Sequence, residues 1–308
     1  MLIRRGFKPC TDADPGRAVA IGNFDGLHLG HQSILADLRA RGRESRLPTA
    51  VLCFEPQPKE YFAPGAAPAR LMRLRDKAKG IAQAGVDELR VLRFDEALAR
   101  LEADDFIERV LVGALRARQL VVGQGFRFGR GRGGDVATLR RAGDARGFAV
   151  TALPALQLGG RAVSSTRVRE AIAAGRLDEA RELLGRDYRI SGRVIAGQRL
   201  GRTLGFRTAN IRLHRRSSPV AGIFAVRASG AGLDRHPGVA SVGTRPTVGG
   251  SEWLLEVHLF DFDRELYRAC LDVDFIARLR DEVRFPDLAS MTVQMQEDAR
   301  LAREMLAA

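Results

Sequence analysis

The segment Gly22-Asn-Phe-Asp-Gly-Leu-His-Leu-Gly-His31 joins an apolar run, residues 18–22, to a stretch of helical periodicity, residues 30–39. This pattern predicts a strand that runs into a helix through a glycine-rich turn. Glycines in such a turn let the backbone approach a ligand closely. His28 and His31 can both face a group above the helix N-terminus, where free amides favour an anion. Imidazole N–H groups suit the charge that develops on a phosphate during transfer.

Short apolar runs alternate with helical segments over the first half of the chain. Strands are predicted at 18–22, 49–54, 89–92, 119–123 and 148–151, and helices at 30–39, 71–84, 104–115 and 135–146. Such alternation predicts an α/β domain with a parallel sheet and right-handed crossovers. Ligands of these sheets bind beyond the carboxyl ends of the strands, where the histidine segment is expected.

The second half of the chain has a different sequence pattern. Two short helices are expected between 164 and 185, and extended runs separated by turns follow at 188–195, 223–228, 238–242, 253–260 and 270–275. These runs predict a small antiparallel sheet or barrel. A final helix, 291–306, carries an apolar stripe expected to pack on the core, formed by Met291, Met295, Ala302 and Met305 or Leu306. We place the domain boundary near 183–187, which gives domains 1–184 and 185–308.

Composition limits the classes of protein that remain. The 308 residues suggest two domains, and 45% apolar residues suffice for real cores. No apolar run is long enough to span a membrane or to act as a secretory signal. Three distant cysteines fit a reduced, cytoplasmic protein, with Cys53 as a buried thiol.

The basic residues are almost all arginines. Lysine and arginine total 50 against 37 acidic residues, a net charge of +13, but the only lysines are Lys8, Lys59, Lys77 and Lys79. The chain has no G-x-x-x-x-G-K-[ST] motif. A phosphate site in the second half must therefore use backbone amides, arginine or a metal ion.

Other interpretations of the two histidines must be weighed. A histidine in a turn is often structural, and His-x-x-His can begin a zinc site. Only five histidines exist, however, and no cysteine pair has ligand spacing. The glycines at 22, 26 and 30 are four apart, so the segment is not a dinucleotide-binding G-x-G-x-x-G motif.

Three further segments carry polar groups suited to nucleotides. Ser164-Ser-Thr-Arg-Val-Arg169 caps a predicted helix and offers hydroxyl and amide donors with an arginine, although a plain N-cap would look the same. Glycines between 192 and 205 form either a phosphate-covering turn or ordinary hairpins. Thr208 and Asn210, two apart on an extended segment, can ligate one Mg²⁺.

A predicted strand in the second half carries a candidate general base. Period two places Leu255, Val257 and Leu259 on one face and Glu256, His258 and Phe260 on the other. The Glu256 carboxylate beside a phosphate site can accept a hydroxyl proton, or it is a solvated edge charge. His258 is expected to support this site or the fold.

Taken together, these segments resemble motifs of the bacterial bifunctional riboflavin kinase/FMN adenylyltransferase family, also called prokaryotic FAD synthetases. Segment 22–31 resembles the family's G-N-F-D-G-x-H-x-G-H signature. Segments 54–58, 122–129 and 164–169 are similar to F-E-P-x-P, V-G-x-D-F-x-F-G and S-S-T-x-I-R. Segments 206–210, 243–247 and 256–262 are similar to F-P-T-A-N, G-x-x-P-T and E-x-H-x-x-D-F. The motifs follow in order over essentially the whole chain.

The resemblance implies a Rossmann-like HxGH nucleotidyltransferase domain followed by a riboflavin kinase β-barrel with a C-terminal helix. It implies that ATP phosphorylates riboflavin to FMN and adenylylates FMN to FAD, with Mg²⁺ as cofactor. The implied catalytic residues are His28, His31 and Glu256. The implied adenylyltransferase ATP contacts are Gly22, Asn23, Phe24, Asp25, Ser164, Ser165, Thr166 and Arg169. The implied flavin contacts are Phe54, Phe62 and Phe128, and the implied kinase ATP contacts are Gly197, Gly201, Thr208 and Asn210, of which Thr208 and Asn210 hold the metal.

Three residues depart from the family pattern. Gly125 stands where the family has Asp or Asn, Arg207 replaces proline, and Arg268 replaces glycine. Two of them lie in the kinase half, so a first alternative is an adenylyltransferase with a degenerate kinase domain.

A second alternative is a basic nucleic-acid-binding protein, motivated by the net charge and the Gly/Arg run 129–134. Three tyrosines, one tryptophan and no basic block argue against it, and we expect neither nucleic acid nor membrane as partner. The oligomeric state stays open.

Overall fold

The computed structural model describes residues 1–6, 14–196, 206–247 and 250–307. Its contacts divide the chain into two compact units, one of residues 1–68 and 73–164, the other of residues 69–72 and 165–308. The predicted boundary at residue 184 stays a prediction. None of the helices in the described ranges is long and apolar enough to cross a membrane.

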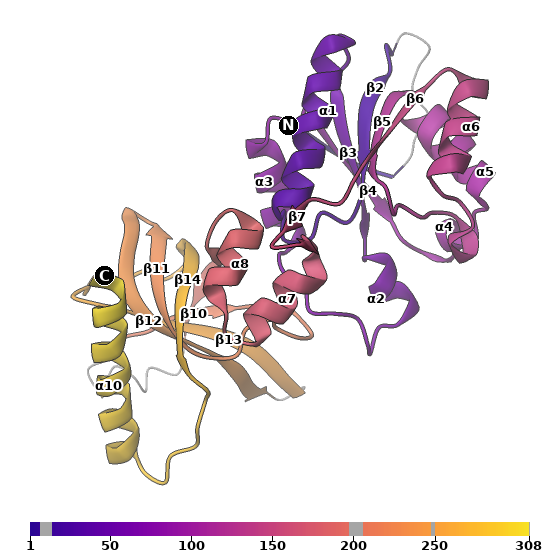
Figure 1. Cartoon of the computed structure of the whole chain (residues 1–308). Helices are drawn as coiled ribbons and strands as arrows, with labels where there is room; N and C mark the ends of the chain where they lie inside the picture. Colours follow the sequence, from indigo (N-terminus) through magenta and orange to yellow (C-terminus); the bar gives the residue numbers. More distant parts are fainter. Residues whose placement is uncertain (7–13, 197–205, 248–249, 308) are drawn as a thin grey trace. The chain divides into compact units, whose positions relative to one another are not determined.

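The first unit is built on a six-stranded sheet in the order β1-β4-β3-β2-β5-β6, with every pairing parallel (Figure 1). The strands are β1 (Leu2–Arg5), β2 (Arg17–Ile21), β3 (Thr49–Glu55), β4 (Glu88–Arg93), β5 (Ala117–Gly123) and β6 (Ala149–Leu153), and a hairpin of β7 (Gln157–Leu158) and β8 (Arg161–Ala162) follows. The strand order reverses between β2 and β5, which is where open α/β sheets bind ligands. The predicted parallel sheet is confirmed, and β1, an edge strand with exposed Leu2 and Ile3, was missed.

Helices cover both faces of this sheet. They are α1 (Leu29–Glu44), α2 (Pro58–Phe62), α3 (Leu74–Gln83), α4 (Glu96–Ala99), α5 (Ala103–Phe106) and α6 (Val136–Arg146), with a π-helix η1 (Ile107–Ala114) and a short 3₁₀ turn η2 (Arg130–Arg132). Figure 1 shows α1 and α3 on one face and α4 to α6 on the other. The helix predicted over 104–115 is instead α5 running into the π-helix, whose apolar side chains are buried in the main core.

A buried ionic cluster joins the amino ends of two strands of the first unit. Glu88, at the start of β4, accepts hydrogen bonds from Arg17 Nε at 3.0 Å and from Arg90. Arg17, at the start of β2, also pairs with Asp14 at 2.8 Å. Arg17, Glu88 and Arg90 are each 5% exposed or less. Buried charges are tolerated only when they are paired, so this cluster depends on all its members.

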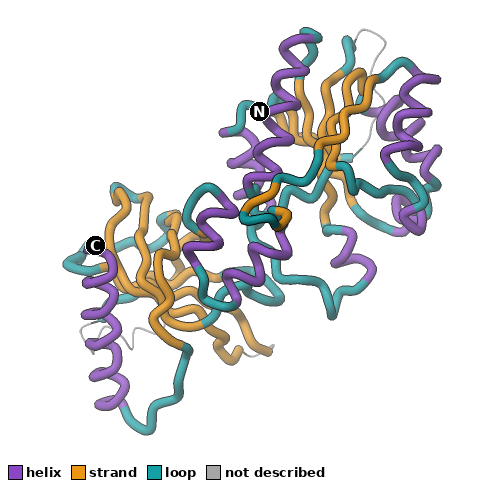
Figure 2. The backbone as a smooth tube through the Cα atoms, viewed as in Figure 1, coloured by secondary structure: helices purple, strands orange, loops and turns teal. Residues whose placement is uncertain are grey.

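The second unit is a closed antiparallel barrel in the order β10-β13-β12-β11-β14-β9, as the turn-separated runs predict (Figure 2). Its strands are β9 (Tyr188–Ile195), β10 (Ala209–Arg212), β11 (Gly222–Gly230), β12 (Leu233–Thr247), β13 (Gly250–Leu259) and β14 (Cys270–Arg280), and its helices are α7 (Ser165–Ala173), α8 (Leu177–Leu184) and α10 (Leu288–Ala307). Strand β10 was not among the predicted strands, although its residue Asn210 was expected on an extended segment.

Helix α10 packs on the barrel through only part of the expected stripe. Ala302 and Leu306 are buried in a cluster with Phe260, whereas Met305 is 47% exposed. Ion pairs add to this contact, because Arg280 binds the buried Asp298 at 2.6 Å and Arg303 binds Asp261 at 2.7 Å. Of the two alternatives, Met305 and Leu306, it is Leu306 that packs on the core.

Replacing Glu88 with Gln should destabilise the first unit by about 3–5 kcal/mol, because two buried guanidinium groups lose their shared carboxylate. Hydrogen exchange of the β2 and β4 amides measures the change in the free energy of opening. The control is Arg100→Gln, which breaks a fully exposed pair with Glu96 and should cost about 0.5 kcal/mol or less. If both variants lower the free energy of opening equally, the buried cluster contributes no more to stability than an exposed ion pair.

Candidate functional site

The loop between β2 and α1 holds the histidines in a strained backbone. The amide of Gly22 donates to the carbonyl of Leu52 at 3.1 Å, which fixes the loop to the neighbouring strand β3. Phe24 and Leu27 are both buried and both have φ of 47°, in the left-handed region. Such conformations cost about 1–3 kcal/mol each and cluster at functional sites. The loop is therefore maintained at a cost in stability.

His28 is the N-cap of α1, and its ring is held in one orientation. Its Nδ1 accepts a hydrogen bond from the amide of His31 at 3.3 Å. In the neutral ring the proton then lies on Nε2, which makes that atom the donor. A Cβ at Gly30 would lie 3.2 Å from His28 Nδ1, so this position favours glycine.

His31 stacks on His28 with ring centroids 3.7 Å apart and planes at 19°. The pKa of His31 is well below its usual value, because burial disfavours the charged imidazolium and the charges of His28 and Lys77 repel it. The ring is therefore neutral at pH 7 and acts as a hydrogen-bonding group. Its Nδ1 atom is buried and has no hydrogen-bond partner among the described residues.

The predicted phosphate motif lies at the start of α7. The helix begins at Ser165, one residue inside the predicted motif, and Thr166 is exposed. Arg169 donates from Nε to the carbonyl of Ala69 at 2.6 Å. Ser164 belongs to the first unit and the rest of the motif to the second. Their joint role in binding ATP stays a prediction, as do the roles of Asn23 and of the buried Asp25.

Two of the three predicted flavin contacts share one aromatic cluster. Phe94 lies 5.8 Å from Phe54 and 5.6 Å from Phe62, measured between ring centroids, and Tyr61 is 5.4 Å from Phe94. Phe62 is 66% exposed, so the cluster offers an open apolar face. Phe94 and Tyr61 were not predicted, although Phe94 directly follows β4 and so lies at the carboxyl edge of the sheet.

Phe128 lies in a second aromatic group. It packs on Phe106 and Phe126 at 5.5 and 5.7 Å and is 7% exposed, within the main core of the first unit. Its role in flavin binding stays a prediction.

The barrel places the predicted kinase residues on neighbouring strands. Asn210 of β10 pairs directly with Glu256 of β13, so their side chains point to the same side of the sheet. The Asn210 amide nitrogen lies 3.4 Å from Thr208 Oγ1 and donates to the Thr208 carbonyl at 3.2 Å. The predicted contacts Gly197 and Gly201 lie outside the described residues.

The oxygens of Thr208 and Asn210 fit a hard cation such as Mg²⁺, which takes few protein ligands and completes its shell with phosphates and water. No group of three or more His, Cys, Asp or Glu side chains suited to a metal occurs in the described part of the chain. A metal held here would need the oxygens of the bound nucleotide.

Glu256 is partnered by an arginine that the sequence did not single out. Arg245, on the adjacent strand β12, forms an ion pair with Glu256 and a second one with Glu282 at 3.4 Å. Burial lowers the pKa of Arg245, but the two carboxylates outweigh this and the pKa is raised overall. Glu256 is therefore held by Arg245 with 26% of its side chain exposed, and its role as general base stays a prediction.

The three departures from the family pattern have different structural outcomes. A Cβ at Gly125 would meet nothing within 4 Å, so the missing Asp or Asn side chain leaves open space. Arg207 donates to the carbonyl of Asp263 at 3.0 Å. Arg268 has φ of 66°, a left-handed conformation that explains the family's glycine and that costs about 1–2 kcal/mol for arginine.

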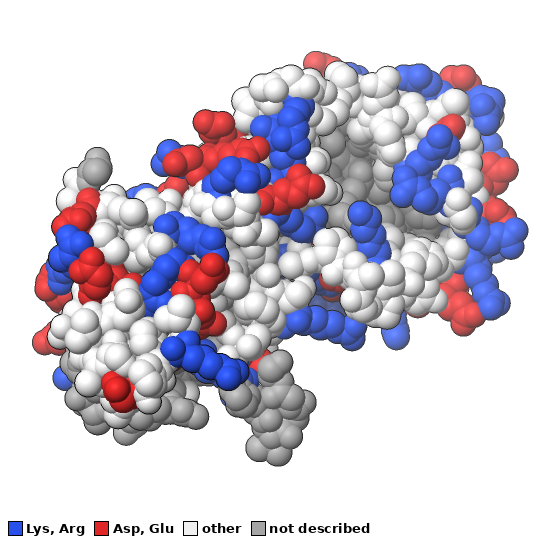
Figure 3. Space-filling model, turned by 60° about the horizontal axis from the view of Figure 1, so that its bottom comes forward, with Lys and Arg blue, Asp and Glu red and all other residues white. Residues whose placement is uncertain are grey.

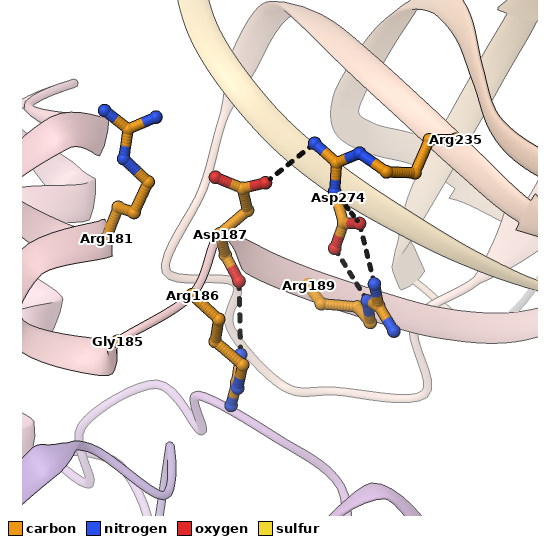
Figure 4. Close-up of a pocket in the computed structure, with 7 residues that line it drawn as sticks. All are labelled: Arg181, Gly185, Arg186, Asp187, Arg189, Arg235 and Asp274. Carbon is orange, nitrogen blue, oxygen red and sulfur yellow. Dashed lines mark hydrogen bonds and ion pairs between the residues drawn. The ribbon is translucent and has the colours of Figure 1, made fainter.

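The face of the molecule drawn in Figure 3 carries charges of both signs. Figure 3 shows basic and acidic side chains intermixed in small groups. A cavity of about 340 Å³ in the second unit illustrates this mixing. Figure 4 shows Arg189 and Arg235 turned toward carboxylates, with Arg189 2.6 Å from Asp274 and Arg235 3.2 Å from Asp187. The cavity is lined by four arginines and two aspartates, so these pairs offset part of its positive charge.

A parallel sheet with a His-x-Gly-His loop at its ligand-binding edge defines the first unit as a nucleotidyltransferase-type domain. A family model of FAD synthetase matches residues 10–167, and one of riboflavin kinase matches residues 184–306. The chain therefore belongs to the bacterial bifunctional riboflavin kinase/FMN adenylyltransferase family.

Relatives with that name match almost end to end. The protein of Haemophilus influenzae is 46% identical over 303 residues, covering 98% of each chain. That of Escherichia coli K12 is 46% identical over 305 residues, covering 99% of this chain and 97% of its own. A solved structure described as a macrolide-efflux protein from Streptococcus pneumoniae is 28% identical, with a TM-score of 0.81, and the match covers 98% of this chain and 99% of that one.

The lowered pKa of His31 predicts a pH dependence of stability. Between about pH 6.5 and the lower folded pKa, the unfolded chain binds a proton that the folded chain does not. The His31 contribution to the unfolding free energy should thus fall on acidification through this window, by about 1.4 kcal/mol per pH unit. Urea unfolding of wild type and His31→Gln at pH 7.5, 6.5 and 5.5 measures it. Identical pH slopes in the two proteins would contradict the prediction.

Proposed function

We propose that the chain phosphorylates riboflavin to FMN with ATP and then adenylylates FMN to FAD with a second ATP. The observation that carries the proposal is the presence of two separate polar sites in one family member. One is the stacked His28–His31 pair after β2, and the other is the Asn210–Glu256 pair in the barrel. The domain limits 1–184 and 185–308 are part of this proposal.

Adenylyl transfer requires a site for charge on phosphorus-bound oxygens. An FMN phosphate oxygen attacks the α-phosphorus of ATP, a new P–O bond forms, and the bond to the bridging oxygen breaks as pyrophosphate leaves. His28 donates from Nε2 and the neutral His31 lies stacked beside it, so both can stabilise charge without a covalent intermediate. In this proposal the backbone of residues 22–25 and the segment 164–169 bind the ATP phosphates, and the Phe54–Phe94–Phe62 cluster contacts the flavin.

Phosphorylation of riboflavin needs a base and charge compensation. Glu256 accepts the proton of the riboflavin 5′-hydroxyl as its oxygen attacks the γ-phosphorus, and ADP leaves. Arg245 holds the Glu256 carboxylate in place by its ion pair. Thr208 and Asn210 would hold Mg²⁺ together with the nucleotide, and the bound ion would supply positive charge to the phosphates. Such a general base contributes about 10²–10⁴-fold to the rate.

The alternatives are less well supported. A degenerate kinase domain would be expected to lose its polar constellation, but Thr208, Asn210 and Glu256 stand together in the barrel wall. A nucleic-acid-binding role finds no continuous basic face on the surface shown in Figure 3. The proposed location is the cytoplasm, where riboflavin, FMN and ATP are the partners.

Product analysis separates the two activities. Glu256→Gln should reduce formation of FMN from riboflavin by about 10²–10⁴-fold while FAD still forms from supplied FMN. His28→Ala should do the reverse, lowering FAD formation by about 10²–10³-fold. The measurement is chromatographic quantification of FMN and FAD from riboflavin or FMN with Mg-ATP.

Wild-type protein that converts neither riboflavin nor FMN would refute the proposal. Conversion of FMN alone, with riboflavin untouched, would establish the degenerate-kinase alternative instead.

A further inference from the structure

Lys77 is a buried cation with no role in the activities derived above. It lies on α3 and is only 1% exposed. It forms no ion pair or hydrogen bond with another residue of the described ranges. Other buried charged residues are paired, as Glu88 is with Arg17 and Asp298 is with Arg280. Removing an ammonium from water without a compensating anion is costly, so this burial calls for an explanation.

The position of α3 brings Lys77 to the histidine loop. Gly80 lies one turn after Lys77 on the same helix face, and a Cβ there would be 2.3 Å from the Leu27 side chain. Helix α3 therefore packs directly against the loop that carries His28. The Lys77 charge also lowers the pKa of both His31 and Cys53, which places the ammonium near the ring and near the carboxyl end of β3.

Two incomplete hydrogen-bonding groups thus meet in one place. Lys77 brings a buried ammonium group, and His31 Nδ1 is a buried atom without a hydrogen-bond partner in the described structure. His31 is neutral at pH 7 and burial raises the pKa of the Cys53 thiol to about 11, so neither group brings a negative charge, whereas the Glu55 carboxylate acts on Cys53 from the end of β3. An anion with several acceptor oxygens matches the donors of Lys77 and the open position at His31 Nδ1.

We propose that Lys77 is a phosphate-binding residue of the histidine site, where its ammonium binds a phosphate oxygen of the nucleotide during adenylyl transfer. This inference rests on the proposed function. It adds a residue that brings a full positive charge to the histidine site. His28 and the neutral His31 offer dipoles, whereas Lys77 balances charge on the α-phosphate or on the departing pyrophosphate. Burial strengthens this interaction, because the effective dielectric constant is low.

The decisive variant is Lys77→Met, which keeps the length of the side chain and removes its charge. We expect kcat/KM for FAD formation from FMN and ATP to fall about 10²-fold. Formation of FMN from riboflavin should be unchanged in the same protein. Lys79→Met is the matched control, since Lys79 is exposed on the same helix, and it should change either rate by no more than about threefold.

Stability distinguishes a ligand-binding lysine from a structural one. If Lys77 is buried for the sake of an anion, the ligand-free Lys77→Met protein should unfold at the same or a higher urea concentration than wild type. A structural lysine would give a lower midpoint. Loss of FAD formation accompanied by a lower midpoint would overturn the proposal, and so would an unchanged rate of FAD formation.

A binding measurement tests Lys77 independently of turnover. His28 and His31 are the two histidines of the first unit, so their imidazole NMR signals report on this site alone. Pyrophosphate should shift these signals in wild type, and Lys77→Met should weaken its binding about 10- to 100-fold. Equal pyrophosphate affinity in both proteins would refute the inference. If the wild-type protein makes no FAD but its binding of pyrophosphate still depends on Lys77, the proposed function is refuted. The inference of a phosphate site at Lys77 is then retained.

Discussion

The hydrogen bond from the amide of His31 to Nδ1 of His28 fixes the chemistry of the first unit. It caps α1, places the remaining ring proton on Nε2 and aligns the two imidazoles in a stack. The left-handed residues Phe24 and Leu27 shape the loop that makes this bond possible. Because the loop follows β2 where the strand order reverses, the donors lie at the edge of the sheet where α/β folds bind ligands.

The barrel meets the same electrostatic demand with different residues. No lysine occurs after Lys79, so a phosphate in the second unit depends on hydroxyl and amide oxygens, arginines and a metal. Strand register does the positioning, since the pairing of β10 with β13 sets Asn210 opposite Glu256 and the pairing of β12 with β13 brings Arg245 near the same carboxylate. The two units thus offer phosphate different groups. The first unit offers imidazoles at a helix N-terminus, and the second offers side-chain oxygens on or next to strands.

Sequence patterns predicted the sheet, the barrel and the histidine pair because each depends on local periodicity or on unusual residues in a turn. They missed what depends on packing between distant segments. Lys77 lies in a polar helical stretch, so the sequence alone suggests that its side chain is exposed. Its burial follows from the packing of α3 against the histidine loop. Arg245 and Phe94 become relevant only through register and strand ends. Helical spacing left Met305 and Leu306 as alternatives in α10, and the packing on the barrel shows that Leu306 is the buried one.

The two sheets differ in how they end. The barrel closes on itself, whereas the parallel sheet stops at β1, which leaves Leu2 and Ile3 beside an unpaired row of backbone groups. An apolar strand at an open edge can template association between copies. Arg4 and Arg5 complete this strand, and a second copy pairing there would bring four guanidinium groups together. Charged side chains on an edge strand disfavour such association between copies.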